Sequence, residues 1–151
     1  MADVKKLTYE RADPLALTPG RVRVFVYGTL KRGQSNHGLL INDQYIGADS
    51  ITMKGRMVDL GAFPGVIRNQ RDEATIRGEV YEVDDDTLNG LDYLEGHPTF
   101  YRRDKYKTDT GIRCWMYTLP DAESYDRCPS QEDALWSPTD DEREFWYAPA
   151  Q

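Results

Sequence analysis

The sequence contains little of what a disulfide-stabilised, membrane-spanning or exported protein needs. It has two cysteines, Cys114 and Cys128, which are too few for a disulfide framework or a cysteine-based zinc site. No apolar run approaches the roughly 18 residues of a membrane-spanning helix, and residues 1–20 lack the apolar stretch of an export signal. We therefore expect a cytoplasmic protein without a membrane partner, in a compartment where thiols stay reduced.

Positive charge is also scarce. The chain has 26 acidic and 19 basic side chains, a net charge of −7. Nucleic-acid backbones and anionic membrane surfaces are bound by clustered Lys and Arg, so the sequence argues against both partners. The acidic excess is confined to residues 121–151, which carry nine acidic and two basic side chains, whereas residues 1–120 carry seventeen of each.

Signatures of common cofactors are missing as well. There is no G-x-x-x-x-G-K-[ST] phosphate loop. The acidic residues 84–86 lack the spacing of a calcium loop and suit a helix cap instead. His37 and His97 are far apart in the sequence, with no third metal ligand spaced with them. The sequence therefore predicts no metal and no cofactor, and Cys114 is expected to be a small buried residue.

The composition is that of a folded domain, with 39% hydrophobic and 11% aromatic residues in a chain of 151. A domain of about 100–150 residues is the usual unit at this length. Pro14 and Pro19 discourage regular structure in residues 1–20, which we interpret as an N-terminal extension. Residues 21–120 are predicted to form the domain, and residues 121–151 an acidic segment packed on it by its aromatic side chains, Trp136, Phe145, Trp146 and Tyr147.

Hydrophobic periodicity predicts an α+β fold in which most strands are antiparallel, because short turns join them. Within residues 21–120, two helices are expected, a short one at 36–43 and a second at 87–95 that begins at the acidic residues 84–86 and ends at Gly96. Residues 60–65 form a turn by composition. The expected strands are 21–27, 44–52, 54–59, 65–68, 75–83, 100–108 and 113–119.

The first candidate for a functional site is the end of the first strand, with the sequence VFVYGTLKRG at 24–33. A strand that breaks at Gly28 presents backbone N–H groups without a partner in the sheet, and such a turn can bind an anion or a carboxylate. Glycine also allows a close approach that a side chain would forbid. The same pattern fits an ordinary turn between a strand and a helix.

The second candidate is Glu95. On a helix, Leu88, Leu91 and Glu95 lie on one stripe, so a carboxylate is placed on the face that enters the core. Burial raises the pKa of a carboxyl group, and a helix C-terminus disfavours negative charge. Both effects produce the proton acceptor that a general base near neutral pH requires.

Less reactive roles are open for the residues around Glu95. The carboxylate could instead lie at the helix edge and pair with Arg102 or Arg103. Asp92 falls off the apolar stripe and is expected to be solvated or to act as a cap. Tyr101 and Tyr117 lie on predicted strands, where packing with a hydroxyl at a solvent edge is the simplest role.

The two candidates occur together, in this order, in the γ-glutamylcyclotransferase-like proteins. VFVYGTLKRGQSNHGLL resembles the first signature of that family, whose first strand ends in Tyr-Gly-[Ser/Thr]-Leu, and is closest to the γ-glutamylamine cyclotransferase branch. GEVY at 78–81, followed by LDYLEGHP at 91–98 and YRR at 101–103, resembles the second signature. LGAFPG at 60–65 and WMY at 115–117 fit looser elements, so the resemblance spans about residues 22–119.

This resemblance implies a compact mixed β-barrel with short flanking helices. It implies an enzyme that releases 5-oxoproline and a free amine or amino acid from a small γ-glutamyl substrate, with no cofactor. The glutamate that matches Glu95 is the catalytic acid and base, and the backbone amides of the Tyr-Gly-Thr-Leu loop hold the γ-glutamyl group. The residues expected to line the pocket are Tyr27, Gly28, Thr29, Leu30, Tyr101 and Tyr117.

Two other functions remain open from the sequence. A binding protein could keep the same pocket and sequester a small ligand without catalysing this reaction, because a fold does not fix a function. An interaction protein could instead use the acidic segment 121–151 to contact a basic partner. The amine carried by the substrate and the oligomeric state are not specified by these motifs.

Overall fold

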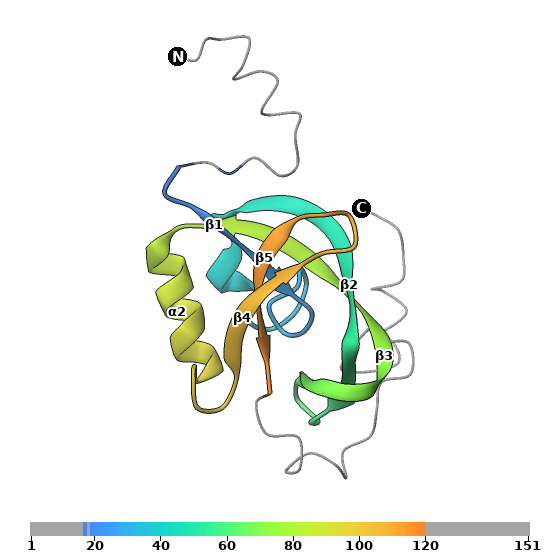
Figure 1. Ribbon diagram of the computed structural model, residues 1–151. Coiled ribbons are helices and arrows are strands. Elements are labelled where there is room, and N and C mark those ends of the chain that lie inside the picture. Colours follow the sequence, from blue (N-terminus) through green and yellow to red (C-terminus); the bar gives the residue numbers. More distant parts are fainter. Residues whose placement is uncertain (1–16, 18, 120–151) are drawn as a thin grey trace.

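The structure is a computed structural model in which residue 17 and residues 19–119 are described. The predicted N-terminal extension, the acidic C-terminal segment and Cys128 lie outside these described residues, apart from the end of the extension. The described part of the chain has β1 as its first strand and β5 as its last (Figure 1).

A mixed sheet of five strands forms the domain. The strands are β1 (Val22–Val26), β2 (Gln44–Asp59), β3 (Pro64–Val83), β4 (Arg102–Lys107) and β5 (Arg113–Thr118). Their order in the sheet is β2-β3-β1-β5-β4. The pairing of β1 with β5 is parallel, and the other three pairings are antiparallel. The predicted α+β class, with a mainly antiparallel sheet, is confirmed.

The strands β2 and β3 are each continuous where the sequence predicts two shorter strands. Their pairing passes from Lys54 with Glu73 to Gly55 with Arg68, so residues 69–72 fall between these two pairs. This irregularity bends the hairpin without ending either strand, as bulges do. The polar sequence at 69–73 is that of an exposed bend. Residues 60–63 form the turn of the hairpin, as predicted, with Leu60 N–H donating to the Phe63 carbonyl at 2.9 Å.

The helix α2 (Asp85–Glu95) begins and ends where its sequence signals predict. Asp84 caps it by accepting a hydrogen bond from the Thr87 N–H at 2.8 Å. Gly96 ends it in the left-handed conformation, with φ of 68°. The first predicted helix is shorter than expected, because the chain forms a single 3₁₀ turn, η1 (His37–Leu40), closed by i to i+3 hydrogen bonds.

The sheet curls as the expected barrel-like fold requires, but it does not close into a complete barrel. The edge strands are β2 and β4, and a full barrel would need a ladder between them. Instead the turn after β4 contacts β2, where Asp109 N–H donates to the Ser50 carbonyl at 2.8 Å. The Asp109 carboxylate accepts from the Thr52 N–H at 3.1 Å. On the other side, Leu119 N–H donates to the Val66 carbonyl at 2.8 Å and completes the curl.

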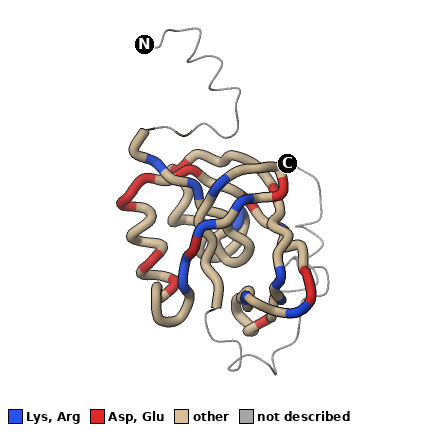
Figure 2. Tube along the Cα trace, viewed as in Figure 1, with Lys and Arg blue, Asp and Glu red and all other residues tan. Residues whose placement is uncertain are grey.

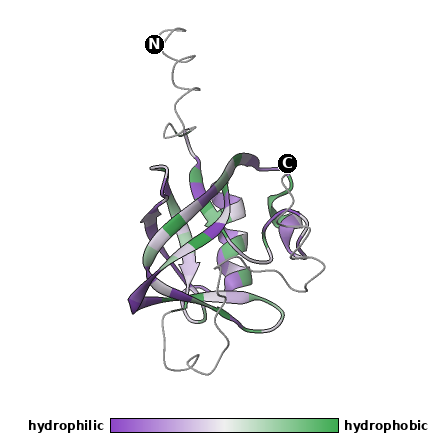
Figure 3. Ribbon diagram, turned by 90° about the vertical axis from the view of Figure 1, so that its right-hand side faces the viewer, coloured by the Kyte–Doolittle hydropathy of each residue, from purple (hydrophilic) through white to green (hydrophobic). Residues whose placement is uncertain are grey.

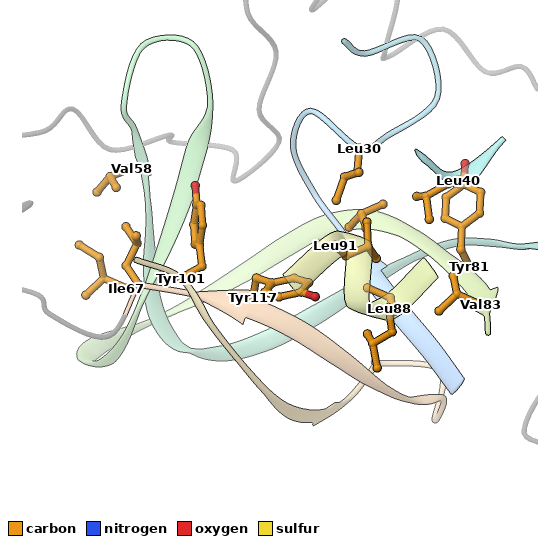
Figure 4. Close-up of a cluster of buried hydrophobic side chains, with 13 residues drawn as sticks. Leu30, Leu40, Val58, Ile67, Tyr81, Val83, Leu88, Leu91, Tyr101 and Tyr117 are labelled. Carbon is orange, nitrogen blue, oxygen red and sulfur yellow. The ribbon is translucent and has the colours of Figure 1, made fainter. Parts of the chain in front are cut away.

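Two hydrophobic clusters fill the fold, and β1 contributes to both. Val24 and Val26 belong to the cluster that also contains Leu88 and Leu91 of α2 (Figure 4). Phe25 points to the opposite face of the sheet and into the second cluster. The ribbon of α2 carries both hydrophobic and hydrophilic positions, as expected for a helix that buries one face (Figure 3). Within residues 19–119, no helix is long and apolar enough to cross a membrane.

Candidate active site

The predicted site residues surround one cavity of about 280 Å³. Its walls come from the loop after β1, the turn between β2 and β3, the end of α2 and the segment that follows it. Among the described residues that line the cavity, Glu95 is the charged one. Figure 2 shows acidic and basic positions spread along the helix and the strands. All the residues predicted for the site line this cavity, namely Tyr27, Gly28, Thr29, Leu30, Glu95, Tyr101 and Tyr117.

The loop after β1 forms the first wall and depends on a glycine. A Cβ atom on Gly28 would lie 2.8 Å from Cγ and Cδ of Pro64, closer than carbon atoms can approach. Among the described residues, no hydrogen bond uses the backbone N–H groups of Gly28, Thr29 or Leu30. These donors belong to residues on the cavity wall, so they are available to an anionic or carbonyl group bound there.

The same loop is held in shape by the residues that follow it. Asn36 donates twice to Thr29, from its backbone N–H to the carbonyl at 2.9 Å and from its side chain to the hydroxyl at 3.0 Å. His37 donates from Nδ1 to the Leu30 carbonyl at 3.0 Å. Behind the loop, the buried Glu79 carboxylate accepts the Arg32 N–H at 3.0 Å. The carbonyls of the loop are therefore occupied.

Glu95 forms the opposite wall, at the end of the apolar stripe predicted for α2. Leu88 and Leu91 are buried, and Glu95 is half-buried at the cavity. Burial raises the pKa of the Glu95 carboxyl from 4.5 to about 7. In the described part of the chain, this carboxylate makes no hydrogen bond or ion pair. The alternative of a pairing with Arg102 or Arg103 is wrong, because Arg102 bonds Asp104 and Arg103 bonds Asp92.

The hydroxyl groups of two cavity tyrosines form hydrogen bonds with the backbone. Tyr27 donates to the Tyr117 carbonyl at 2.7 Å and accepts the Val66 N–H at 3.2 Å. Tyr101 donates to the Pro64 carbonyl. Burial raises the pKa of Tyr27 well above its ordinary value, and the Tyr101 phenol and Glu95 add to this effect. These hydroxyls link the walls of the cavity, and their rings shape it.

Asp92 is neither solvated nor a cap, which corrects the expectation for this residue. Its carboxylate accepts two hydrogen bonds from Arg103, at 2.7 and 3.0 Å, and one from the Tyr117 hydroxyl at 2.6 Å. Burial by itself raises the pKa of Asp92, but the hydrogen bonds from Arg103 and Tyr117 outweigh it and hold the pKa below its ordinary value. The residues that donate hydrogen bonds to Asp92 come from β4 and β5 and are distant in sequence.

Several further lining residues were not singled out from the sequence. Phe63, Pro64 and Phe100 join the cavity wall, and Phe100 packs against Tyr101 with ring centroids 5.0 Å apart. The LGAFPG segment at 60–65, with an aromatic ring between small residues, was the available signal for Phe63 and Pro64. The other lining residues outside the predicted set are Phe25, Val26, Ser35, Asn36, Ala62 and Leu94.

The remaining polar candidates have structural roles. His37 packs against Tyr81, and His97 accepts the Arg103 N–H at 3.2 Å. Cys114 is buried, as expected, and burial raises the pKa of its thiol to about 12. Across residues 19–119, no three His, Cys, Asp or Glu side chains gather in a group that could hold a metal ion.

Comparisons with known proteins agree with this architecture. A family model described as gamma-glutamyl cyclotransferase, AIG2-like, matches residues 24–138. A Vibrio cholerae protein, provisionally named as a gamma-glutamylcyclotransferase, is 44% identical over 94 residues, which cover 62% of this chain and 78% of that protein. The gamma-glutamylaminecyclotransferase of Mus musculus is 32% identical over 134 residues, covering 68% of this chain and 88% of that protein.

Solved structures share the fold. The crystal structure of an AIG2-like protein from Mus musculus superimposes with a TM-score of 0.68 and 25% sequence identity, covering 78% of this chain and 88% of that one. A solution structure of an Escherichia coli protein, ytfP, superimposes with a TM-score of 0.58 and 33% identity, covering 76% and 95%. The chain therefore shares its fold with these proteins.

Proposed function

This chain belongs to the AIG2-like gamma-glutamyl cyclotransferase family, and we propose that it converts a γ-glutamyl amine or amino acid into 5-oxoproline and the free amine, with Glu95 as the acid and base. The observation that carries this proposal is one cavity lined both by the half-buried Glu95 carboxylate and by Gly28, Thr29 and Leu30, whose N–H groups bond to none of the described residues. The reaction needs a base and a site for developing negative charge, and this cavity offers one of each.

The reaction begins with the α-amine of the substrate, which is the nucleophile. At neutral pH this amine is an ammonium group, so it must lose a proton before it attacks the γ-carbonyl carbon. Glu95, with its pKa raised to about 7 by burial, is ionised in a useful fraction at that pH and can take the proton. A bond forms between the α-nitrogen and the γ-carbon, and the carbonyl oxygen gains negative charge.

The second step breaks the bond between the γ-carbon and the leaving nitrogen. The protonated Glu95 gives its proton to that nitrogen, so the bond breaks and the carboxylate is regenerated. The α-nitrogen, which carries one surplus proton after the attack, loses it to this carboxylate as the lactam forms. The released amine then takes that proton from Glu95 and departs as an ammonium group. Water is not consumed, and the two products contain all the atoms of the substrate. The N–H groups of Gly28, Thr29 and Leu30 are the donors that we assign to the substrate's carboxylate or to the developing oxyanion.

The shape of the cavity contributes through orientation. Both reacting groups belong to one flexible substrate, which must fold so that its amine meets its γ-carbonyl. Holding an intramolecular pair in this geometry can supply about 7–11 kcal/mol of the barrier. The rings of Tyr27, Phe63 and Tyr101, and the Gly28 contact with Pro64, restrict the space in which the substrate folds.

The proposal is tested by incubating the full-length protein with a panel of γ-glutamyl amines and γ-glutamyl amino acids. We expect 5-oxoproline and an equimolar amount of free amine from at least one member, measured by mass spectrometry. The matched control is the same compound with its α-amine acetylated, which cannot cyclise and must give no product. Folded protein that releases 5-oxoproline from no member of the panel would contradict the proposal.

A further inference from the structure

A second carboxylate on α2, that of Asp92, is hydrogen-bonded by side chains of the sheet. Arg103 of β4 approaches it with Nε at 2.7 Å and Nη2 at 3.0 Å, and the Tyr117 hydroxyl of β5 at 2.6 Å. Two-pronged pairs of this kind fix the relative orientation of both groups. In Figure 4, the Tyr117 side chain reaches from β5 towards α2. These contacts therefore join the helix to two strands at its last turns.

Arg103 is itself held in place on its outer side. Its guanidinium lies over the Trp115 ring, 4.3 Å from the centroid, a contact that favours arginine. Its backbone N–H donates to His97 Nδ1 at 3.2 Å. The last turn of α2 contains no basic residue of its own, so Arg103 supplies from β4 the positive charge that a helix C-terminus favours.

The turn that Asp92 anchors is the turn that carries Glu95. The two residues are three positions apart, about one turn of helix, and the Asp92 carbonyl accepts the N–H groups of Gly96 and His97. The Glu95 carbonyl accepts the Tyr101 N–H at 3.2 Å. Nothing in the described part of the chain hydrogen-bonds the Glu95 carboxylate, so its place in the cavity depends on the backbone around it.

We propose that Asp92, gripped by Arg103 and Tyr117, is a positioning residue that fixes the last turn of α2 and thereby holds the Glu95 carboxyl in the cavity. Tyr117 extends this link to the opposite wall, because its carbonyl accepts the Tyr27 hydroxyl at 2.7 Å. Through this chain of contacts, the base and the loop after β1 keep a fixed separation. The inference rests on the proposed function, since it assigns a role relative to the catalytic residue named there.

The test substitutes Asp92→Asn, which keeps the size of the side chain and removes its charge. The matched control is Asp86→Asn, an exposed aspartate in the first turn of the same helix. A second variant, Arg103→Lys, keeps the positive charge but loses the two-pronged geometry, and it replaces Asp92→Asn if that protein does not fold. Two quantities are measured for each folded variant: kcat and KM for the active γ-glutamyl compound, and the titration of the Glu95 carboxyl by carbon NMR.

The proposal predicts that Asp92→Asn lowers kcat about tenfold with KM changed less than twofold. It also predicts that the Glu95 titration moves from near 7 towards 4.5, because a loosened turn exposes the carboxyl to water. Arg103→Lys should fall between Asp92→Asn and the wild type, and Asp86→Asn should behave as the wild type. Loss of kcat in proportion to the folded fraction, with an unmoved Glu95 titration, would show a merely structural role and overturn the proposal.

The NMR titration needs no substrate, so the two hypotheses fail separately. If the wild type releases 5-oxoproline from no compound, the proposed function is wrong, and the position of Glu95 is still decided by its titration in the variants. If the wild type turns over substrate while folded Asp92→Asn keeps both its kcat and its Glu95 titration, the positioning role of Asp92 is wrong and the proposed function stands.

Discussion

The last turns of α2 carry two carboxylates, Asp92 and Glu95, whose pKa values are shifted in opposite directions. Asp92 faces β4 and β5, where Arg103 and Tyr117 donate three hydrogen bonds to it and hold its pKa below the ordinary value. Glu95, one turn further on, faces the cavity, where burial raises its pKa to about 7. The helix is the same and both carboxylates are partly buried. The two differ in hydrogen bonding: β4 and β5 supply donors to Asp92, whereas no described residue donates to the Glu95 carboxylate.

This difference suits the two carboxylates to different roles, one structural and one chemical. A carboxylate that is fully hydrogen-bonded stays ionised and binds no proton at neutral pH, so it is suited to fixing a helix. A carboxylate that is desolvated and without partners can exchange a proton at neutral pH, which suits an acid and base. Each prediction below alters one side of this comparison.

The largest effect is expected from Glu95→Gln, which removes the proton acceptor and nearly preserves the shape of the side chain. General acid–base catalysis contributes about 10²–10⁴-fold, so kcat should fall by that factor while KM changes little. The measurement is steady-state release of 5-oxoproline, with Glu73→Gln, an exposed glutamate of β3, as the matched control. A Glu95→Gln protein that retains more than a tenth of the wild-type kcat would remove Glu95 from its proposed role.

On the other side of the turn, Asp92→Ala should lower the free energy of unfolding. It leaves the Arg103 guanidinium and the Tyr117 hydroxyl without their acceptor in a half-buried place. We expect the free energy of unfolding to fall by about 2–3 kcal/mol. Urea denaturation gives this quantity, and the exposed Asp86→Ala variant should lose less than about 1 kcal/mol. Equal losses in the two proteins would mean that the Asp92 contacts contribute nothing to the fold.

The raised pKa of Glu95 makes stability depend on pH in a definite direction. The folded protein binds the Glu95 proton more tightly than the unfolded chain does, because burial lifts the pKa from 4.5 to about 7. Stability contributed by the protonated group is therefore complete below pH 4.5 and is lost as the pH rises through 7.

Glu95→Gln has no group to titrate at this place, so it should be more stable than the wild type at pH 8 by about 1–3 kcal/mol. The two proteins should have nearly equal stability at pH 4. Denaturation curves of both proteins across this pH range measure the gap. A gap that is constant with pH would show that the folded environment does not perturb Glu95.

The smallest effect is expected from Tyr117→Phe, which keeps the ring in the cavity and removes one of the three donors to Asp92. Arg103 still holds the carboxylate, so the free energy of unfolding should fall by about 1 kcal/mol. The pKa of Asp92 should rise towards its ordinary value, because one hydrogen bond to its ionised form is lost. Carbon NMR reads that titration directly. A larger loss of stability than Asp92→Ala causes would contradict the assigned partners.

Local sequence signals predict the elements that carry the site. The end of β1 shortly before Gly28, the cap at Asp84 and the end of α2 at Gly96 are each set by residue type within a few positions. The stripe of Leu88 and Leu91 likewise predicts that Glu95 is turned towards the interior, since helical periodicity is a local property. These parts of the site need no knowledge of the tertiary structure.

What the sequence could not predict depends on contacts between distant residues. The strands β2 and β3 continue through a bend, and this bend arises from a shift in the pairing register between Lys54 and Gly55. The wrong expectation for Asp92 has the same origin, because Arg103 and Tyr117 lie eleven and twenty-five positions away in the chain. Whether a carboxylate on a helix is solvated or paired is decided by the strand packed beside it.

The central claim is that one turn of α2 holds two carboxylates in opposite states, and a direct titration of both tests it. Carbon NMR of the wild-type protein, with the signals assigned by Glu95→Gln and Asp92→Asn, follows each carboxyl from pH 2 to 9. We predict a midpoint near 7 for Glu95 and a midpoint below the ordinary aspartate value for Asp92. Ordinary midpoints for both groups, with Glu95 near 4.5, would contradict the account.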